Sequence, residues 1–181
     1  ETLEAQVGGS CRVTLIRAQI KETLKQFPTV KNVVVTVNGR GEDIILFDIA
    51  PNYSRIKGIE DKVKIVQGNL AYSSEVFNVV KHHNIKGIYH LGGMLSVPSN
   101  ANPWASFQTN VCGTVHILEA ARLFDVEKVV FSSSFGTYGL KAPPVITDDT
   151  IQRPINMYGI GKLYCELLGM FYKNQFGLDF R

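Results

Sequence analysis

The order of apolar and polar residues predicts alternating strands and helices along most of the chain. Short runs rich in Val and Ile, bounded by turn residues, predict strands at 33–37, 44–47, 62–66, 87–91 and 129–131, and residues 178–181 begin another. Helical spacing of apolar residues occurs in the segments 12–27, 73–83, 103–124 and 157–174. On the last helix, we expect a buried stripe made of Ile160, Tyr164, Leu167 and Phe171. This alternation from residue 43 onward predicts an α/β fold, with a Rossmann-type parallel sheet and helices on both faces.

The first quarter of the chain has a different character. Its predicted helix ends at Pro28, and the strand 33–37 is closed by the turn signal Asn38–Gly39. We therefore expect an N-terminal helix–strand segment at 1–43, followed by a domain at 44–181. The stretch 8–40 (GGSCRVTLIRAQIKETLKQFPTVKNVVVTVNGR) resembles the C-terminal end of a GerMN domain, a module of spore-germination and related bacterial envelope proteins. That resemblance implies no catalytic motif in this segment.

Composition excludes several classes of protein. The net charge of +3 comes from scattered basic residues, which argues against nucleic-acid binding. No apolar run approaches the roughly 20 residues of a membrane span, and the start shows no signal peptide. The three cysteines, Cys11, Cys112 and Cys165, have no CxxC or His spacing, which is typical of reduced thiols in a cytoplasmic protein. The pair His82–His83 lacks further ligands at metal-site spacing, so we expect no metal.

A pair of residues with chemical potential lies in the last predicted helix. Tyr158 and Lys162 are four residues apart, so a helix places both side chains on one face. A phenol normally holds its proton until about pH 10, and a nearby ammonium group lowers that pKa. Such a tyrosine can act as a general acid or base near neutral pH. The alternative is an ordinary surface Tyr–Lys pair.

The residues before this helix favour the chemical interpretation. The buried strand 129–131 runs into Ser132–Ser134, and Ser134 precedes Tyr158 by 24 residues. A hydroxyl at the end of a strand, facing such a helix, can polarise a substrate hydroxyl or carbonyl. The chain from 44 to 181 resembles the extended short-chain dehydrogenase/reductase family of NAD(P)-dependent epimerases and dehydratases. The matching motifs are YHLGG (89–93), NVCGT (110–114), LEAAR (118–122), VEKVV (126–130), FSSSFGTYG (131–139) and YGIGK (158–162).

The resemblance implies a set of cofactor and catalytic residues. An acidic residue at the end of the second strand binds the ribose hydroxyls of NAD and repels the extra phosphate of NADP. Asp48 matches it, which implies NAD rather than NADP; its alternative role is a helix or turn cap. The other implied cofactor-binding residues are Asn69, Leu70, Leu91, Gly92, Gly93, Asn110, Tyr158 and Lys162. The implied catalytic residues are Ser134, Tyr158 and Lys162.

The implied reaction is hydride transfer at a carbinol carbon of a small molecule, with a nucleotide sugar as the first candidate substrate. Residues 149–159 and 166–181 also resemble the L-threonine 3-dehydrogenase branch, which is the alternative. Because family members often pair through two long helices, a homodimer through 103–124 and 157–174 is a further expectation.

Two departures from the family pattern leave other functions open. The family begins with a strand and a glycine-rich turn that binds the pyrophosphate, yet Gly8–Gly9 does not match the turn and Gly39–Gly41 lies directly before the strand that ends at Asp48. The C-terminal substrate region is not represented either. We therefore expect a Rossmann layer that is incomplete at both ends and doubtful activity for this chain. A non-catalytic nucleotide-binding or envelope protein, or two unrelated pieces fused near Asp43, remain alternatives.

Overall fold

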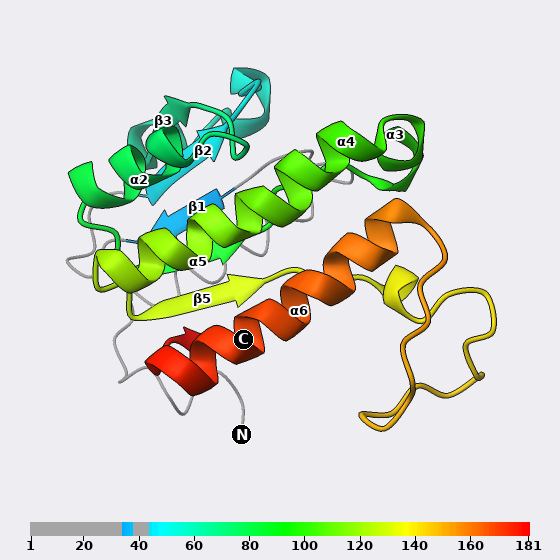
Figure 1. Ribbon diagram of the computed structural model, residues 1–181. Coiled ribbons are helices and arrows are strands. Elements are labelled where there is room, and N and C mark those ends of the chain that lie inside the picture. Colours follow the sequence, from blue (N-terminus) through cyan, green and yellow to red (C-terminus); the bar gives the residue numbers. More distant parts are fainter. Residues whose placement is uncertain (1–33, 38–43) are drawn as a thin grey trace.

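A six-stranded sheet organises the part of the chain that the structure describes. The computed structural model describes residues 34–37 and 44–181. The sheet has the order β3-β2-β1-β4-β5-β6 (Figure 1). Its strands are β1 (Val34–Val37), β2 (Ile44–Asp48), β3 (Val63–Gln67), β4 (Gly87–His90), β5 (Lys128–Phe131) and β6 (Asp179–Phe180). Each of these strands was predicted, whereas the predicted helix 12–27 and all of the GerMN-like segment except β1 lie outside the described residues.

Strand β1 lies outside the range, from residue 43 onward, for which a parallel sheet was predicted, and it joins the sheet in the antiparallel direction. The pairs β2–β3, β4–β5 and β5–β6 are parallel, as expected. Strand β1 lies in the centre and is antiparallel to both neighbours, so that Val34 is opposite Phe47 and His90. A parallel crossover needs about a dozen residues or more. Residues 38–43 are too few for one, so β1 and β2 can only pair as an antiparallel hairpin.

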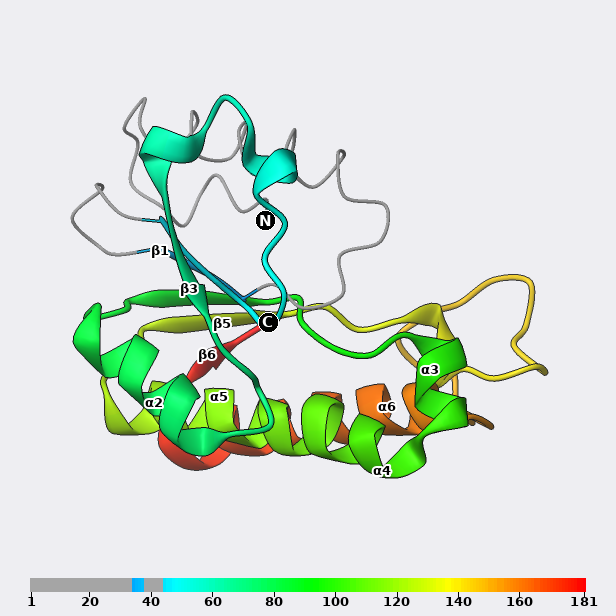
Figure 2. The same ribbon diagram turned by 90° about the horizontal axis from the view of Figure 1, so that it is seen from above.

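The described helices cover one face of the sheet, not both (Figure 2). They are α2 (Ser73–His82), α3 (Ser96–Ala101), α4 (Pro103–Ser106), α5 (Gly113–Leu123) and α6 (Met157–Phe176). The π-helix η4 (Phe107–Cys112) joins α4 to α5, and together they form the long helix predicted at 103–124. Helix α3 was not predicted. Within the described ranges, none of these helices is both long and apolar enough to cross a membrane.

The main core lies between the sheet and helices α2, α5 and α6. Val76, Val79 and Val80 of α2 are buried there, as their spacing predicted. They belong to a cluster with residues of the strands and of α5, including Ile45, Phe47, Ile88, Ile117, Leu118 and Val129. Burial of such side chains stabilises the fold by about 1.5–3 kcal/mol each. This packing holds the strands and helices in place, and the site is built at the carboxyl ends of those strands.

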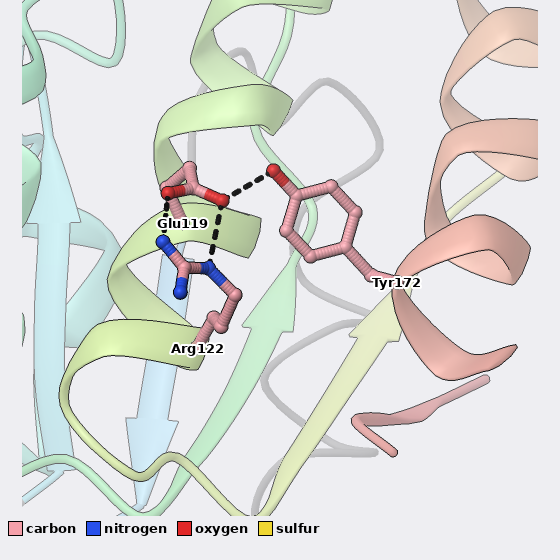
Figure 3. A network of polar contacts seen from close by, with 3 residues as sticks. All are labelled: Glu119, Arg122 and Tyr172. Carbon is pink, nitrogen blue, oxygen red and sulfur yellow. Dashed lines mark hydrogen bonds and ion pairs between the residues drawn. The ribbon is translucent and has the colours of Figure 1, made fainter. Parts of the chain in front are cut away.

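A polar contact joins α5 and α6 at their C-terminal halves (Figure 3). The hydroxyl of Tyr172 donates to Glu119 Oε1 at 2.5 Å. Arg122 donates to the same carboxylate through Nε at 3.1 Å and Nη2 at 2.7 Å. The guanidinium also lies 5.2 Å from the ring centroid of Phe176 on α6. These contacts fix the two helices relative to one another next to the core.

The buried face of α6 is not the one that the apolar spacing predicted. Four residues of the predicted stripe are exposed: Ile160 by 48%, Tyr164 by 49%, Leu167 by 59% and Phe171 by 52%. The helix buries Gly159, Gly161, Lys162, Cys165, Gly169 and Tyr172 instead. The physical reason is close packing, because a Cβ at Gly169 would lie 2.1 Å from the ring of Phe180. Only small residues fit there, and the large apolar residues therefore point outward.

Candidate active site

The predicted site residues gather at one edge of the sheet. The carboxyl ends of the parallel strands share this edge, where open α/β sheets bind their ligands. Asp48 ends β2, Asn69 follows β3, Gly92–Gly93 follow β4 and Ser134 follows β5. Helix α6 begins near the same edge, since it contacts the 3₁₀-helix η5 (Phe135–Thr137) that Ser134 caps. The fold thus brings segments far apart in the sequence to one place.

Ser134 and Tyr158 lie on either side of Gly136. The Oγ atom of Ser134 accepts a hydrogen bond from Gly136 N at 3.1 Å. A Cβ at Gly136 would lie 3.4 Å from this Oγ and 3.9 Å from Cδ1 of Tyr158. The serine and the tyrosine ring are therefore near neighbours.

A backbone carbonyl, that of Ser132, holds the ammonium of Lys162. Its ammonium donates to Ser132 O at 2.5 Å, and the side chain is only 5% exposed. The ammonium lies 4.5 Å from the ring centroid of Phe131 and 5.7 Å from that of Tyr158. Burial lowers the pKa of Lys162 to about 8, against the opposing influence of Cys165 and Glu166. At neutral pH the group is mostly protonated, so a positive charge lies beside the tyrosine.

The first turn of α6 is fixed by two asparagines and a close approach. Asn156 Oδ1 accepts from Gly159 N at 2.8 Å, which is an N-cap contact. Asn100 Oδ1, from α3, accepts from Met157 N at 3.1 Å. A Cβ at Gly159 would lie 2.4 Å from the carbonyl oxygen of Gly136. The glycine after Tyr158 therefore allows the helix to start directly against the turn that carries Ser134.

Asn110 clamps the loop that follows β4. Its Oδ1 accepts from Met94 N at 2.6 Å, and its Nδ2 donates to Met94 O at 2.9 Å. The residue is 5% exposed and lies in the π-helix η4, an irregularity that often marks functional sites. A Cβ at Gly93 would lie 3.0 Å from Asn110 Oδ1. Asn110 thus acts on the candidate cofactor loop by shaping its backbone.

His90 is a buried residue of this region that the sequence did not single out. Thr114 Oγ1 donates to Asn110 O at 2.6 Å, so it accepts from His90 Nε2, 2.8 Å away. The histidine therefore carries its proton on Nε2, and its Nδ1 has no hydrogen-bond partner among the described residues. Burial first, and then the charge of Lys162, lower the pKa of His90 to about 3. A neutral imidazole thus supports the carbonyl of Asn110.

The candidate residues for the adenosine side have local partners. Asp48 Oδ1 accepts from Ala50 N at 2.7 Å, which is the turn-cap role, and burial raises the pKa of Asp48. Asn69 Oδ1 accepts from Ala71 N at 2.9 Å. Leu70 is 4% exposed and packs in the core, whereas Leu91 is half-buried. Asp48 keeps its second carboxylate oxygen for a ligand, and Asn69 keeps its side-chain NH₂ group. Because the side chain of Leu70 is buried, only its backbone could contact a ligand.

Two polar residues near Ser134, Glu166 and Gln152, were missed by the sequence interpretation. Glu166 accepts from Ser133 Oγ through Oε1 and from Gln152 Nε2 through Oε2, the latter at 2.8 Å. The signal that could have found Glu166 is its position four residues after Lys162, on the same face of α6. Gln152 lies in an irregular loop, and no sequence pattern marks it.

Metal binding finds no support in the described ranges. No group of three or more His, Cys, Asp or Glu side chains could hold an ion there. The rings of His82 and His83 contact each other edge to face at 4.9 Å.

Comparison with known families decides the class. A family model described as GDP-mannose 4,6 dehydratase matches residues 31–181. The chain belongs to this family. The family is of the NAD-dependent epimerase/dehydratase type, as the motifs around Ser134 and Tyr158 indicated. The match begins before residue 44, and the division of the chain at that residue stays a prediction.

The chain is similar to two kinds of enzyme in particular, UDP-glucose 4-epimerases and L-threonine 3-dehydrogenases. The UDP-glucose 4-epimerase of Lactobacillus helveticus is 32% identical over 127 residues, which are 70% of this chain and 38% of that protein. The structure of L-threonine 3-dehydrogenase from Trypanosoma brucei has a TM-score of 0.66 and 30% identity, covering 75% of this chain and 42% of that one. The UDP-glucose 4-epimerase of Brucella ovis, in complex with NAD, has a TM-score of 0.68 and 26% identity, covering 78% and 43%. The chain thus spans less than half of each of these proteins.

Proposed function

We propose that this chain supplies the catalytic part of an NAD-dependent oxidoreductase of the epimerase/dehydratase type, with a nucleotide sugar as substrate. The observation that carries the proposal is that Ser134 and Tyr158 both lie beside Gly136, with the ammonium of Lys162 5.7 Å from the Tyr158 ring, at the carboxyl edge of the sheet. Support comes from the family and from its epimerase relatives, two of which act on UDP-glucose by name.

Each of the three residues has a distinct task in the proposed reaction. Bound NAD would supply the hydride acceptor. As the carbinol carbon gives up its hydride to that acceptor and becomes a carbonyl, Tyr158 would take the hydroxyl proton. Lys162 keeps a positive charge beside the ring of Tyr158. Ser134 Oγ accepts from a backbone amide, so its own proton can be donated to the substrate oxygen.

In this proposal, residues at the carboxyl edge of the sheet bind the two nucleoside ends of NAD. Asp48, at the end of β2, would bind the hydroxyls of one ribose, and Lys162 would contact the other ribose. The pyrophosphate is different, because the C-terminal end of the antiparallel β1 lies beside Gly87, at the opposite edge of the sheet. The end of β1 therefore does not lie at the edge of the sheet that carries Asp48 and Ser134.

The test is Tyr158→Phe in a version extended at both ends to the length of its relatives. Loss of general acid–base action lowers turnover by a factor of about 10² to 10⁴. NAD binding should stay nearly unchanged, because the ring and its packing are retained. Turnover within a factor of about two of the parent would contradict the role of Tyr158.

The second candidate is an L-threonine 3-dehydrogenase-like enzyme. It is favoured by the Trypanosoma brucei structure, whose 30% identity exceeds the 26% of the Brucella ovis epimerase. The same extended protein separates the two. Interconversion of UDP-glucose and UDP-galactose supports the first candidate, and NADH formation from L-threonine supports the second.

A homodimer through α6 is the partner that we propose. The exposed stripe Ile160, Tyr164, Leu167 and Phe171 is a large apolar surface along one helix, and pairing through this helix and α5 is an expectation from the family resemblance. Sedimentation velocity over a range of concentrations tests it. Leu167→Glu should shift the protein toward monomer, whereas Asn78→Glu on α2, at an exposed position, should not. Equal behaviour of both variants would refute this interface.

A further inference from the structure

Glu166 connects the catalytic helix to both sides of Ser134. It lies one turn after Lys162 on α6, and its side chain is half-buried. Its Oε1 accepts from Ser133, the residue before the candidate catalytic serine. Its Oε2 accepts from Gln152 Nε2 at 2.8 Å. A carboxylate can only accept, and bonds from donors to a charged acceptor are stronger than neutral ones.

The hydrogen bond from Gln152 to Glu166 continues through Thr137 to Ser134 itself. Gln152 Nε2 also donates to Thr137 Oγ1 at 2.9 Å. The hydroxyl of Thr137 donates to Ser134 O at 3.0 Å, and its backbone N–H donates to the same oxygen at 3.2 Å. Thr137 is 1% exposed, so this path is shielded from water. The backbone of Ser134 is therefore held from two directions, and both paths end on one carboxylate.

We propose that Glu166 is a positioning residue that holds Ser134 against the Tyr158–Lys162 face of α6, through Ser133 on one side and Gln152–Thr137 on the other. Gln152 belongs to the loop between η5 and α6, so the same contact anchors that loop. The use of this arrangement in catalysis rests on the proposed function, but the contacts can be tested without turnover.

Glu166 also influences the charge of the site. Its carboxylate raises the pKa of Lys162 against the larger effect of burial. Cys165 acts on the pKa of Lys162 in the same direction as Glu166. The ring of Tyr158 lies 5.7 Å from the ammonium, and Lys162 lowers the pKa of His90 on β4. Removing the negative charge at residue 166 should therefore lower the pKa of Lys162 further below about 8. This pKa reports the charge at residue 166, and the hydrogen exchange of Gly136 and Thr137 reports the contacts that position Ser134.

The experiment uses the chain as it is, in variants Glu166→Gln and Gln152→Ala. NMR of ¹³Cε-labelled lysine, assigned with Lys162→Met, follows the titration of Lys162, and amide hydrogen exchange follows Gly136 and Thr137. For Glu166→Gln we expect a lower Lys162 pKa and about tenfold faster exchange, a factor that corresponds to about 1.4 kcal/mol. For Gln152→Ala we expect the faster exchange with an unchanged pKa.

Glu127→Gln is the matched control, because this residue is exposed and precedes β5 at the opposite edge of the sheet. If Glu166→Gln behaves like this control in both measurements, the inference is wrong. If Glu166→Gln does not fold, the exchange of Gln152→Ala decides, and unchanged protection of Thr137 overturns the inference. Neither outcome depends on turnover, so the proposed function can fail or stand separately.

Discussion

Gly159→Ala should separate catalysis from stability in this site. The added Cβ would lie 2.4 Å from Gly136 O and 3.0 Å from both Gly136 C and Pro154 Cβ. An ordinary contact begins at 3.4 Å, so the start of α6 and the turn after Ser134 must move apart by about 1 Å. The two candidate catalytic residues, Tyr158 and Ser134, lie on opposite sides of that contact. A misplacement of about 1 Å can cost a factor of about 10² in rate.

The effect on stability should be small by comparison. Overpacking costs about 1–3 kcal/mol. Alanine in place of glycine in a helix contributes about 1 kcal/mol in the other direction. The net loss is then about 0–2 kcal/mol, or a decrease in Tm of less than about 8 °C for a chain of this size.

Gly161→Ala is the matched control on the same helix. Its Cβ would lie 3.5 Å from Val111 Cγ2 and 3.9 Å from Asn110 Cβ, which are ordinary contacts. We expect a Tm equal to or above that of the parent, with turnover retained. The assays are thermal unfolding of this chain and steady-state turnover of the extended protein. Turnover of Gly159→Ala within about twofold of Gly161→Ala would refute the close-approach explanation.

The remaining predictions concern the cofactor and the α5–α6 contact. Asp48 should make the protein prefer NAD over NADP, and tighter NADP binding at one salt concentration would refute its role. This chain alone should bind NAD weakly in calorimetry. Two or three missing hydrogen bonds to phosphate, at about 1.5–3 kcal/mol each, weaken binding by about two to six orders of magnitude. A low-micromolar dissociation constant would contradict this. Tyr172→Phe should lower the free energy of unfolding by about 1–2 kcal/mol at pH 7. Burial and Glu119 raise the pKa of Tyr172 from 10.0 to about 12. The difference in unfolding free energy between variant and parent is therefore present below pH 10 and lost as the pH rises through about 12. A difference that persists above that pH would contradict the assignment.

The strands, the long helices and the site could be read from local patterns. Runs of Val and Ile mark buried strands, and Tyr158 and Lys162 are placed on one face by helical geometry alone. Ser134 could be added because strand ends in such sheets lie at one edge. These features depend on neighbours within a few residues or on a general rule of topology, which a sequence carries.

Features that depend on packing between distant segments could not be read in the same way. The spacing of Ile160, Tyr164 and Leu167 predicts one buried face, but the close approach of Phe180 to Gly169 selects the opposite one. Helix α3 contains Pro98 and little apolar periodicity, so it gave no helical signal. The direction of β1 was readable, because Asn38–Gly39 is a hairpin signal and the connection to β2 is short. The parallel sheet was predicted from residue 43 onward, and the pairs β2–β3, β4–β5 and β5–β6 confirm it there.

Strand β1 has only four residues, yet it lies in the centre of the sheet and joins its two halves. It is the hydrogen-bonded link between the β2–β3 half, which carries Asp48, and the β4–β6 half, which leads into Ser134. The packing of α2 on α5 is the second link between the halves. Separation of β1 from either neighbour would let the halves hinge on these two helices and would change the distance between Asp48 and Lys162. A dinucleotide that binds both residues would hold the two halves of the sheet together. It would therefore slow the hydrogen exchange of the β1 amides.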